Sequence, residues 1–182
     1  MTTQTAIVLV AAVVVVVGLL AWTFMRQKRS LALKERFGPE YDHELRERGR
    51  GRAEAELDRR ARRVERLSIR PLPPGDRDRY AELWRNEQAR FVDDPKSAVH
   101  EADHLVEEVM RRRGYPVGEF DQRAADISVD HPLVVENYRA AHDIAARLDR
   151  GNVATEDLRQ AMIHYRTLFE DLLEDRVVAM VR

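Results

Sequence analysis

The segment AIVLVAAVVVVVGLLAWTFM, from Ala6 to Met25, constrains the fold of this chain more than any other feature. It contains no charged side chain, and a helix of about 20 residues rises about 30 Å, the thickness of a bilayer's hydrocarbon core. The preceding residues, MTTQT, include no basic side chain, whereas a cleaved signal peptide carries positive charge before its apolar stretch. We therefore expect residues 6–25 to form a retained transmembrane anchor.

A basic cluster, Arg26, Lys28 and Arg29, follows this segment directly. Because Lys and Arg next to a membrane helix stay on the cytoplasmic side, the cluster predicts the orientation of the anchor. Residues 1–5 would be a short extracytoplasmic N-terminus, and everything from residue 26 onward would be cytoplasmic.

Residues 26–69 have the pattern of a basic helical neck. Gly38-Pro39 should end one helix and start the next. The following helix has Leu57, Ala61 and Val64 as a narrow apolar seam among charged residues, which is typical of a solvated helix. Residues 1–75 carry 15 Lys and Arg against 9 Asp and Glu, whereas residues 76–182 carry 16 against 23. The two halves should therefore have different surroundings.

The arginines of the neck allow two interpretations. They could contact anionic lipid headgroups, or they could belong to a helix face crossed by ion pairs with interleaved glutamates. Nucleic acid fits less well, because the neck lacks an aromatic stacking platform. The apolar seam is too short to predict self-association, although it would permit it. The candidate lipid-facing side chains are Arg26, Lys28, Arg29, Arg59, Arg60, Arg62 and Arg63.

Residues 70–182 are expected to form a cytoplasmic helical bundle. The breaker RPLPPG precedes apolar stripes at spacings of three and four residues, and no segment alternates with the period of a strand. Turns marked by Pro or Gly separate four long helices and one short helix, and Trp84 should lie at the centre of their core. The predicted fold class of the whole chain is all-α.

The segment HEADH, residues 100–104, has the outline of the zinc-binding H-E-x-x-H motif. On a helix, however, Ala98, Val99, Ala102 and Leu105 share one face, and His100 and His104 point to the opposite one. A catalytic zinc site needs a walled cleft and a third ligand at a recognisable spacing, and the sequence offers neither. A structural surface helix is the favoured interpretation.

Two further groups of residues need an interpretation. His142-Asp143 resembles the paired His-Asp of the HD metal phosphohydrolases, but only the dipeptide matches, so a packed histidine is favoured. Tyr115, Asp121, Arg123 and Asp126 could form a polar recognition surface at one end of the bundle. The sequence has no Gly-rich phosphate loop. It assigns no catalytic residue and no cofactor or metal, and His100, His104 and His142 are only weak metal-ligand candidates.

The chain also resembles an uncharacterised family of bacterial single-pass membrane-anchored helical proteins. The matching stretches are RFGPEYD, QARFVDDP, RGYP, QRAADISVDHP, VENYRAAH and TEDLRQAMIHYR, and they cover most of the chain after the anchor. The resemblance implies a bacterial inner membrane and the same order of anchor, neck and helical domain. It supplies no activity.

Two functions from different classes follow as hypotheses. The first is a membrane-anchored cytoplasmic interaction or scaffold module, whose partners would be the bilayer, anionic headgroups and another protein or a second copy. The alternative is a metal-dependent hydrolase that uses His100, His104, His142 and nearby carboxylates. We expect the first, because no catalytic constellation accompanies the anchor and the amphipathic helices.

Overall fold

The computed structural model describes residues 3–148, 150–151 and 153–174, without the side chains of residues 3–13. All regular elements in this part of the chain are helices, which confirms the predicted all-α class. Their bounds are α1 (Thr3–Phe37), α2 (Pro39–Arg48), α3 (Arg50–Val64), α4 (Pro74–Arg90), α5 (Pro95–Arg113), α6 (Phe120–Asp130), α7 (Val135–Leu148) and α8 (Thr155–Leu173).

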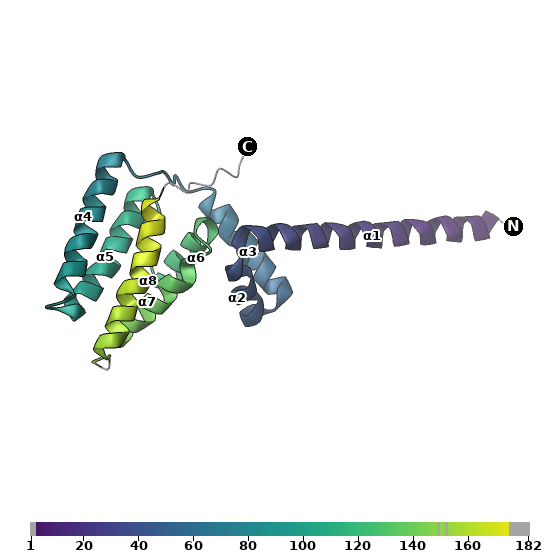
Figure 1. The fold of residues 1–182 in the computed structure, drawn as a ribbon. Coiled ribbons are helices and arrows are strands. Elements are labelled where there is room, and N and C mark those ends of the chain that lie inside the picture. Colours follow the sequence, from purple (N-terminus) through teal and green to yellow (C-terminus); the bar gives the residue numbers. More distant parts are fainter. Residues whose placement is uncertain (1–2, 149, 152, 175–182) are drawn as a thin grey trace.

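Helices α4 to α8 form a bundle, with α8 packed between α5 and α7 (Figure 1). Trp84 of α4 is buried and stacks on Phe169 of α8, with ring centroids 4.7 Å apart. The face of α5 predicted to be apolar is the one that is buried, and both of its histidines are exposed. The four long helices and the shorter α6 correspond to those expected from the sequence.

Residues 30–67, which we call the neck unit, build a second core. Leu33 and Phe37 from the end of α1 pack with Leu57 and Ala61 of α3, and Val129 of α6 closes this core from the bundle side. The expectation of a solvated helix with a free apolar seam is therefore wrong. The seam is buried within the chain, because the turn at Gly38 folds α2 and α3 back onto α1.

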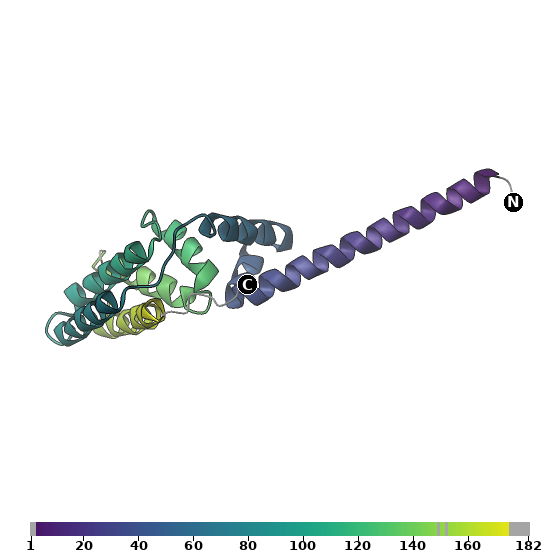
Figure 2. The ribbon, with the colours of Figure 1, turned by 90° about the horizontal axis from the view of Figure 1, so that it is seen from above.

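Helix α1 continues far beyond the neck unit and projects away from the rest of the protein (Figures 1 and 2). Its large apolar side chains from Val14 to Met25 are 54–64% exposed. Among the residues that the structure describes, we find no helix with the length and apolarity needed to cross a membrane. The predicted anchor lies partly outside the described side chains, at residues 6–13, and the predicted terminal segment includes residues 1–2, which are not described.

Candidate functional site

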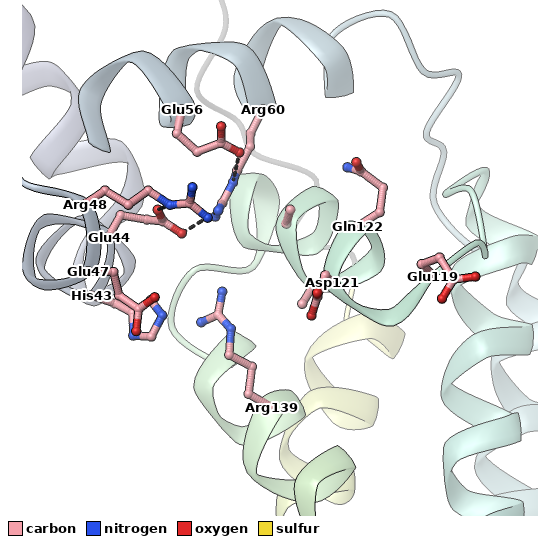
Figure 3. A pocket seen from close by; sticks show the side chains of 12 residues that line it. His43, Glu44, Glu47, Arg48, Glu56, Arg60, Glu119, Asp121, Gln122 and Arg139 are labelled. Atoms are coloured by element: carbon pink, nitrogen blue, oxygen red, sulfur yellow. Dashed lines mark hydrogen bonds and ion pairs between the residues drawn. The ribbon is translucent and has the colours of Figure 1, made fainter. Parts of the chain in front are cut away.

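A polar cleft of about 600 Å³ lies where the neck unit meets the bundle (Figure 3). Its walls come from α2, α3, the start of α6, and Arg139 of α7. The cleft forms because α3 packs along α6 and leaves the end of α2 facing the loop before α6.

Arg60 lies at the base of this cleft and is almost fully buried. Its guanidinium donates to Glu40 at 2.7 Å and to Glu56 at 3.1 Å, and it also donates to Glu44. Burial alone would lower the pKa of Arg60, but these carboxylates raise it. The group therefore stays charged, and its hydrogen-bonding capacity is used within the protein.

Arg139 connects the bundle to the neck unit. Its two terminal nitrogens each donate to one carboxylate oxygen of Glu40 at 2.7 Å, a bidentate pairing between α7 and α2. Burial alone would raise the pKa of Glu40, but the hydrogen bonds and charges of Arg139 and Arg60 outweigh burial and lower it. Glu40 is therefore an ionised and fully buried carboxylate shared by two arginines.

A second buried carboxylate holds the three helices of the neck unit together. Glu54 of α3 accepts hydrogen bonds from Ser30 of α1 at 2.6 Å, from Tyr41 of α2 at 3.0 Å and from Arg50 at 3.0 Å. Burial would raise the pKa of Glu54, but these three donors lower it. The neck unit thus combines its small apolar core with fully satisfied buried charges, which favour a single packing arrangement.

The chemistry available in the cleft is limited by this pairing. Each of the lining arginines, Arg48, Arg60 and Arg139, is already bonded to a glutamate. The exposed charged side chains of the lining are Arg48, which pairs with Glu44, and the carboxylates Glu47, Glu119 and Asp121. Arg60 and Arg139 both pair with Glu40, so these charges of the cleft hold the neck unit against the bundle.

The structure separates the predicted lipid-facing residues into distinct environments. Arg26, Lys28, Arg29, Arg59 and Arg62 are exposed. The prediction for Arg60 is wrong, because this side chain points inward to Glu40 and Glu44. Half-buried Arg63 forms an ion pair at 3.0 Å with Asp126, which is fully buried, so Arg63 faces the bundle.

Three of the four residues predicted for a recognition surface are inside the protein. Tyr115, Arg123 and Asp126 are buried, and only Asp121 is exposed. Tyr115 donates to Asp130 at 2.6 Å, and Arg123 donates to the hydroxyl of Tyr138 at 3.0 Å. These side chains therefore stabilise the loop between α5 and α6, and the four residues share no common surface.

The candidate metal ligands lie on different faces of the bundle. His100 and His104 are on the exposed face of α5, whereas half-buried His142 of α7 stacks on Phe120 with ring centroids 3.6 Å apart. His142 Nδ1 is buried without a hydrogen-bond partner among the described atoms. Within the same part of the chain, no group of three or more His, Cys, Asp and Glu residues is placed to hold a metal ion.

The pairing of His131 with Asp171 did not follow from the sequence. Buried His131 lies at the end of α6, and its Nδ1 is 2.5 Å from an oxygen of Asp171 on α8. A contact between residues 40 positions apart leaves no local signal that could have identified it.

Comparison with known proteins does not assign this chain to a family. No family model matches it, and neither a curated protein nor a solved structure matches it significantly. The resemblance to a bacterial membrane-anchored family stays a prediction.

Proposed function

We propose that this protein holds a helical interaction module at the cytoplasmic face of a membrane, with the first two-thirds of α1 in the bilayer. The observation that carries the proposal is the projecting helix whose apolar side chains, from Val14 to Met25, are exposed along its length. An exposed apolar surface of this extent requires a membrane or a protein partner. Because the sequence from Ala6 to Val13 is also free of charge, the bilayer is the partner whose dimensions fit.

The end of the apolar run has the side chains of a membrane interface. Trp22 and Phe24 lie there, with Arg26 positioned 5.5 Å from the ring centre of Trp22 and Lys28 positioned 5.1 Å from that of Phe24. Amphipathic aromatic rings favour the headgroup level, and the basic residues beyond them favour the cytoplasmic side. The expected orientation therefore has the bundle in the cytoplasm, and the resemblance to a bacterial membrane-anchored family favours a bacterial inner membrane as the location.

Flotation of the full-length chain with neutral phosphatidylcholine vesicles tests the attachment. Wild-type protein should float and resist alkaline extraction, and Val16→Asp should lose most of this association because a charge near the bilayer centre costs about 3 kcal/mol. Leu31→Asp is the matched control, since Leu31 is equally exposed but lies beyond the apolar run. Wild-type protein that stays in the aqueous phase, as a monomer or a soluble oligomer, would overturn the proposal.

The orientation and the interaction role have their own tests. Protease added outside sealed inside-out vesicles should digest the bundle, whereas right-side-out vesicles should protect it.

For the interaction role, a photo-crosslinking amino acid at exposed His104 of α5 should give one discrete adduct in native membranes. No adduct from this position or from other exposed bundle positions would contradict the interaction role while leaving membrane attachment intact.

A further inference from the structure

We propose that the turn between α2 and α3 is a binding site for the phosphate headgroups of anionic phospholipids. The site consists of Arg46 and Arg48 at the end of α2, and Arg50 and Arg52 at the start of α3. The inference rests on the proposed membrane attachment and adds which lipid class is recognised and by which residues.

The direction of α3 determines which of its ends faces the membrane. Ser30 of α1 contacts Glu54 of α3 at 2.6 Å, and further along both helices Arg36 contacts Glu65 at 3.2 Å. The two helices therefore run in parallel, and the start of α3 is the end nearer to the apolar run of α1. Figure 2 shows α2 and α3 beside the base of the projecting helix.

Arg50 fixes the height of this turn relative to the bilayer. Its Nη2 donates to Ser30 Oγ at 2.9 Å, so the α2–α3 turn lies level with the basic cluster that follows Met25. Trp22 and Phe24, the predicted interfacial residues, lie about 9 to 12 Å further along α1 at 1.5 Å per residue. Because the headgroup region is only about 5 to 8 Å thick on each side, the turn lies at its outer edge, where arginine side chains can reach the lipid phosphates.

The chemistry of the turn suits a phosphate. Arg46 and Arg52 are exposed and make no ion pair with any described residue, whereas Arg48 and Arg50 are held by Glu44 and Glu54. Gly49, with φ of 72°, separates the two helices and leaves the amino terminus of α3 uncovered. The exposed peptide N–H groups and the positive end of the helix dipole add to the attraction of the arginines for an anion.

The far end of α3 lacks these properties. Arg62 lies ten residues beyond Arg52, which corresponds to about 15 Å along the helix, or roughly two Debye lengths at physiological salt. Arg60 is buried there, and Arg63 pairs with Asp126. The structure therefore favours lipid contact at the α2–α3 turn over lipid contact at the arginines near the end of α3.

The test compares two pairs of substitutions that remove the same charge from the full-length chain. Arg46→Gln/Arg52→Gln changes the proposed site, and Arg62→Gln/Arg66→Gln changes exposed residues at or just beyond the other end of α3. Each protein is reconstituted into vesicles of equal phosphatidylglycerol and phosphatidylcholine, purified in mild detergent, and analysed for retained lipids by native mass spectrometry. The wild type and the second pair should retain phosphatidylglycerol preferentially, and the first pair should lose that preference roughly tenfold or more.

The possible outcomes separate the inference from the proposed function. A wild-type chain that floats with neutral vesicles but shows no preference for phosphatidylglycerol would overturn the inference alone. Equal losses from both pairs would also overturn it, because the attraction would then be general charge. A chain that does not float with neutral vesicles at all would overturn membrane attachment and this site together.

Discussion

At the scale of single residues, the contact between the neck unit and the bundle depends on buried charges. Glu40 is fully buried between Arg60 and Arg139, and an uncompensated carboxylate there would be very costly. Such a network is a poor source of net stability but selects one docking geometry, since any other arrangement leaves a buried charge unpaired. Glu40 therefore specifies how the two units fit together.

Replacing Glu40 should destabilise the protein strongly. Glu40→Gln leaves two arginines facing a neutral amide in a buried site, with an expected loss of about 3 kcal/mol in the free energy of unfolding. The measurement is urea unfolding of the full chain in mild detergent, followed by circular dichroism. Glu170→Gln, which breaks the exposed pair with Arg166, is the control and should unfold like the wild type. Similar stability of Glu40→Gln and wild type would contradict the role of Glu40.

The same carboxylate predicts a pH dependence. Because the pKa of Glu40 is lower in the folded chain, its contribution is present above the ordinary glutamate pKa of about 4.3 and is lost as the pH falls through the lowered value. The stability difference between wild type and Glu40→Gln should therefore be constant from neutral pH to about pH 5, and should shrink as the pH falls below the ordinary glutamate pKa. Urea unfolding of both proteins at a series of pH values measures this difference in the free energy of unfolding. A difference that does not change with pH would show that the charge of Glu40 is not what stabilises the contact.

The sequence contained part of the information on these residues. Arg60 follows Leu57 by three positions and precedes Val64 by four, so the periodicity that defined the apolar seam also places Arg60 on the buried face. Arg59 and Arg62, in the same arginine-rich run, are exposed. The partner of Arg60 could not be inferred, because Glu40 is 20 residues away on another helix.

At the scale of helices, breaker residues predicted some ends well and others poorly. Gly38-Pro39 separates α1 from α2 as expected, and Gly114 ends α5. By the same rule Pro132 would start the next helix, but α7 begins only at Val135. Between them lies a turn in which the peptide N–H of Val134 donates to the carbonyl of His131 at 3.2 Å. Local sequence specifies where a helix cannot continue, but packing of the turn decides where the next one starts.

Three glycine substitutions should give graded losses of stability. Gly114 has φ of 100°, and an added Cβ would lie 2.6 Å from the backbone oxygen of Ser68. Gly49 has φ of 72° but no neighbour within 4 Å, and Gly118 has neither constraint. In thermal unfolding, Gly118→Ala should resemble the wild type. Gly49→Ala should lose about 1–3 kcal/mol from backbone strain, because φ of 72° with ψ of 157° is a conformation that only glycine adopts readily. Gly114→Ala should lose more, and a Gly114→Ala variant as stable as Gly118→Ala would contradict the close contact with Ser68.

The neck unit should be separable from the bundle as a cooperative element. Leu57 is fully buried in the second core, so Leu57→Asp should unfold α2 and α3 while the larger core around Trp84 and Phe169 stays intact. Hydrogen exchange followed by mass spectrometry should then show lost protection in residues 39–64 and retained protection in α5 and α8. Ala55→Asp, an exposed change on the same helix, is the control. Loss of protection throughout the bundle would mean that the two units fold as one.

At the scale of the whole molecule, the sequence predicted the all-α class and the helices of the bundle but not the second core. The pairing of Arg139 with Glu40 joins residues 99 positions apart, and Arg63 contacts Asp126 across 63 positions. Helical periodicity reports which face of a helix is apolar, without reporting which distant helix covers it. A neck that appears solvated in the sequence is therefore a folded unit docked on the bundle.

Because the neck unit is docked on the bundle, the projecting helix is rigidly continuous with the rest of the protein. Helix α1 runs without a break from Thr3 to Phe37, and its last turns contribute Leu33 and Phe37 to the second core. The orientation of the bundle relative to the membrane should therefore be fixed. Four glycines inserted between Met25 and Arg26 should release it, since glycine disfavours a continuous helix by about 1 kcal/mol per residue, whereas four alanines should preserve the helix.

The absence of cysteine from the sequence allows a single label at Thr167→Cys, an exposed position on α8. Energy transfer from this label to acceptor-labelled lipid headgroups should give a narrow distance distribution for the uninserted chain and for the alanine insertion. The glycine insertion should give a broad distribution while flotation with vesicles stays unchanged. Equal widths for all three would mean that the neck unit does not fix the bundle relative to α1, and that the module is tethered to the membrane without a defined orientation.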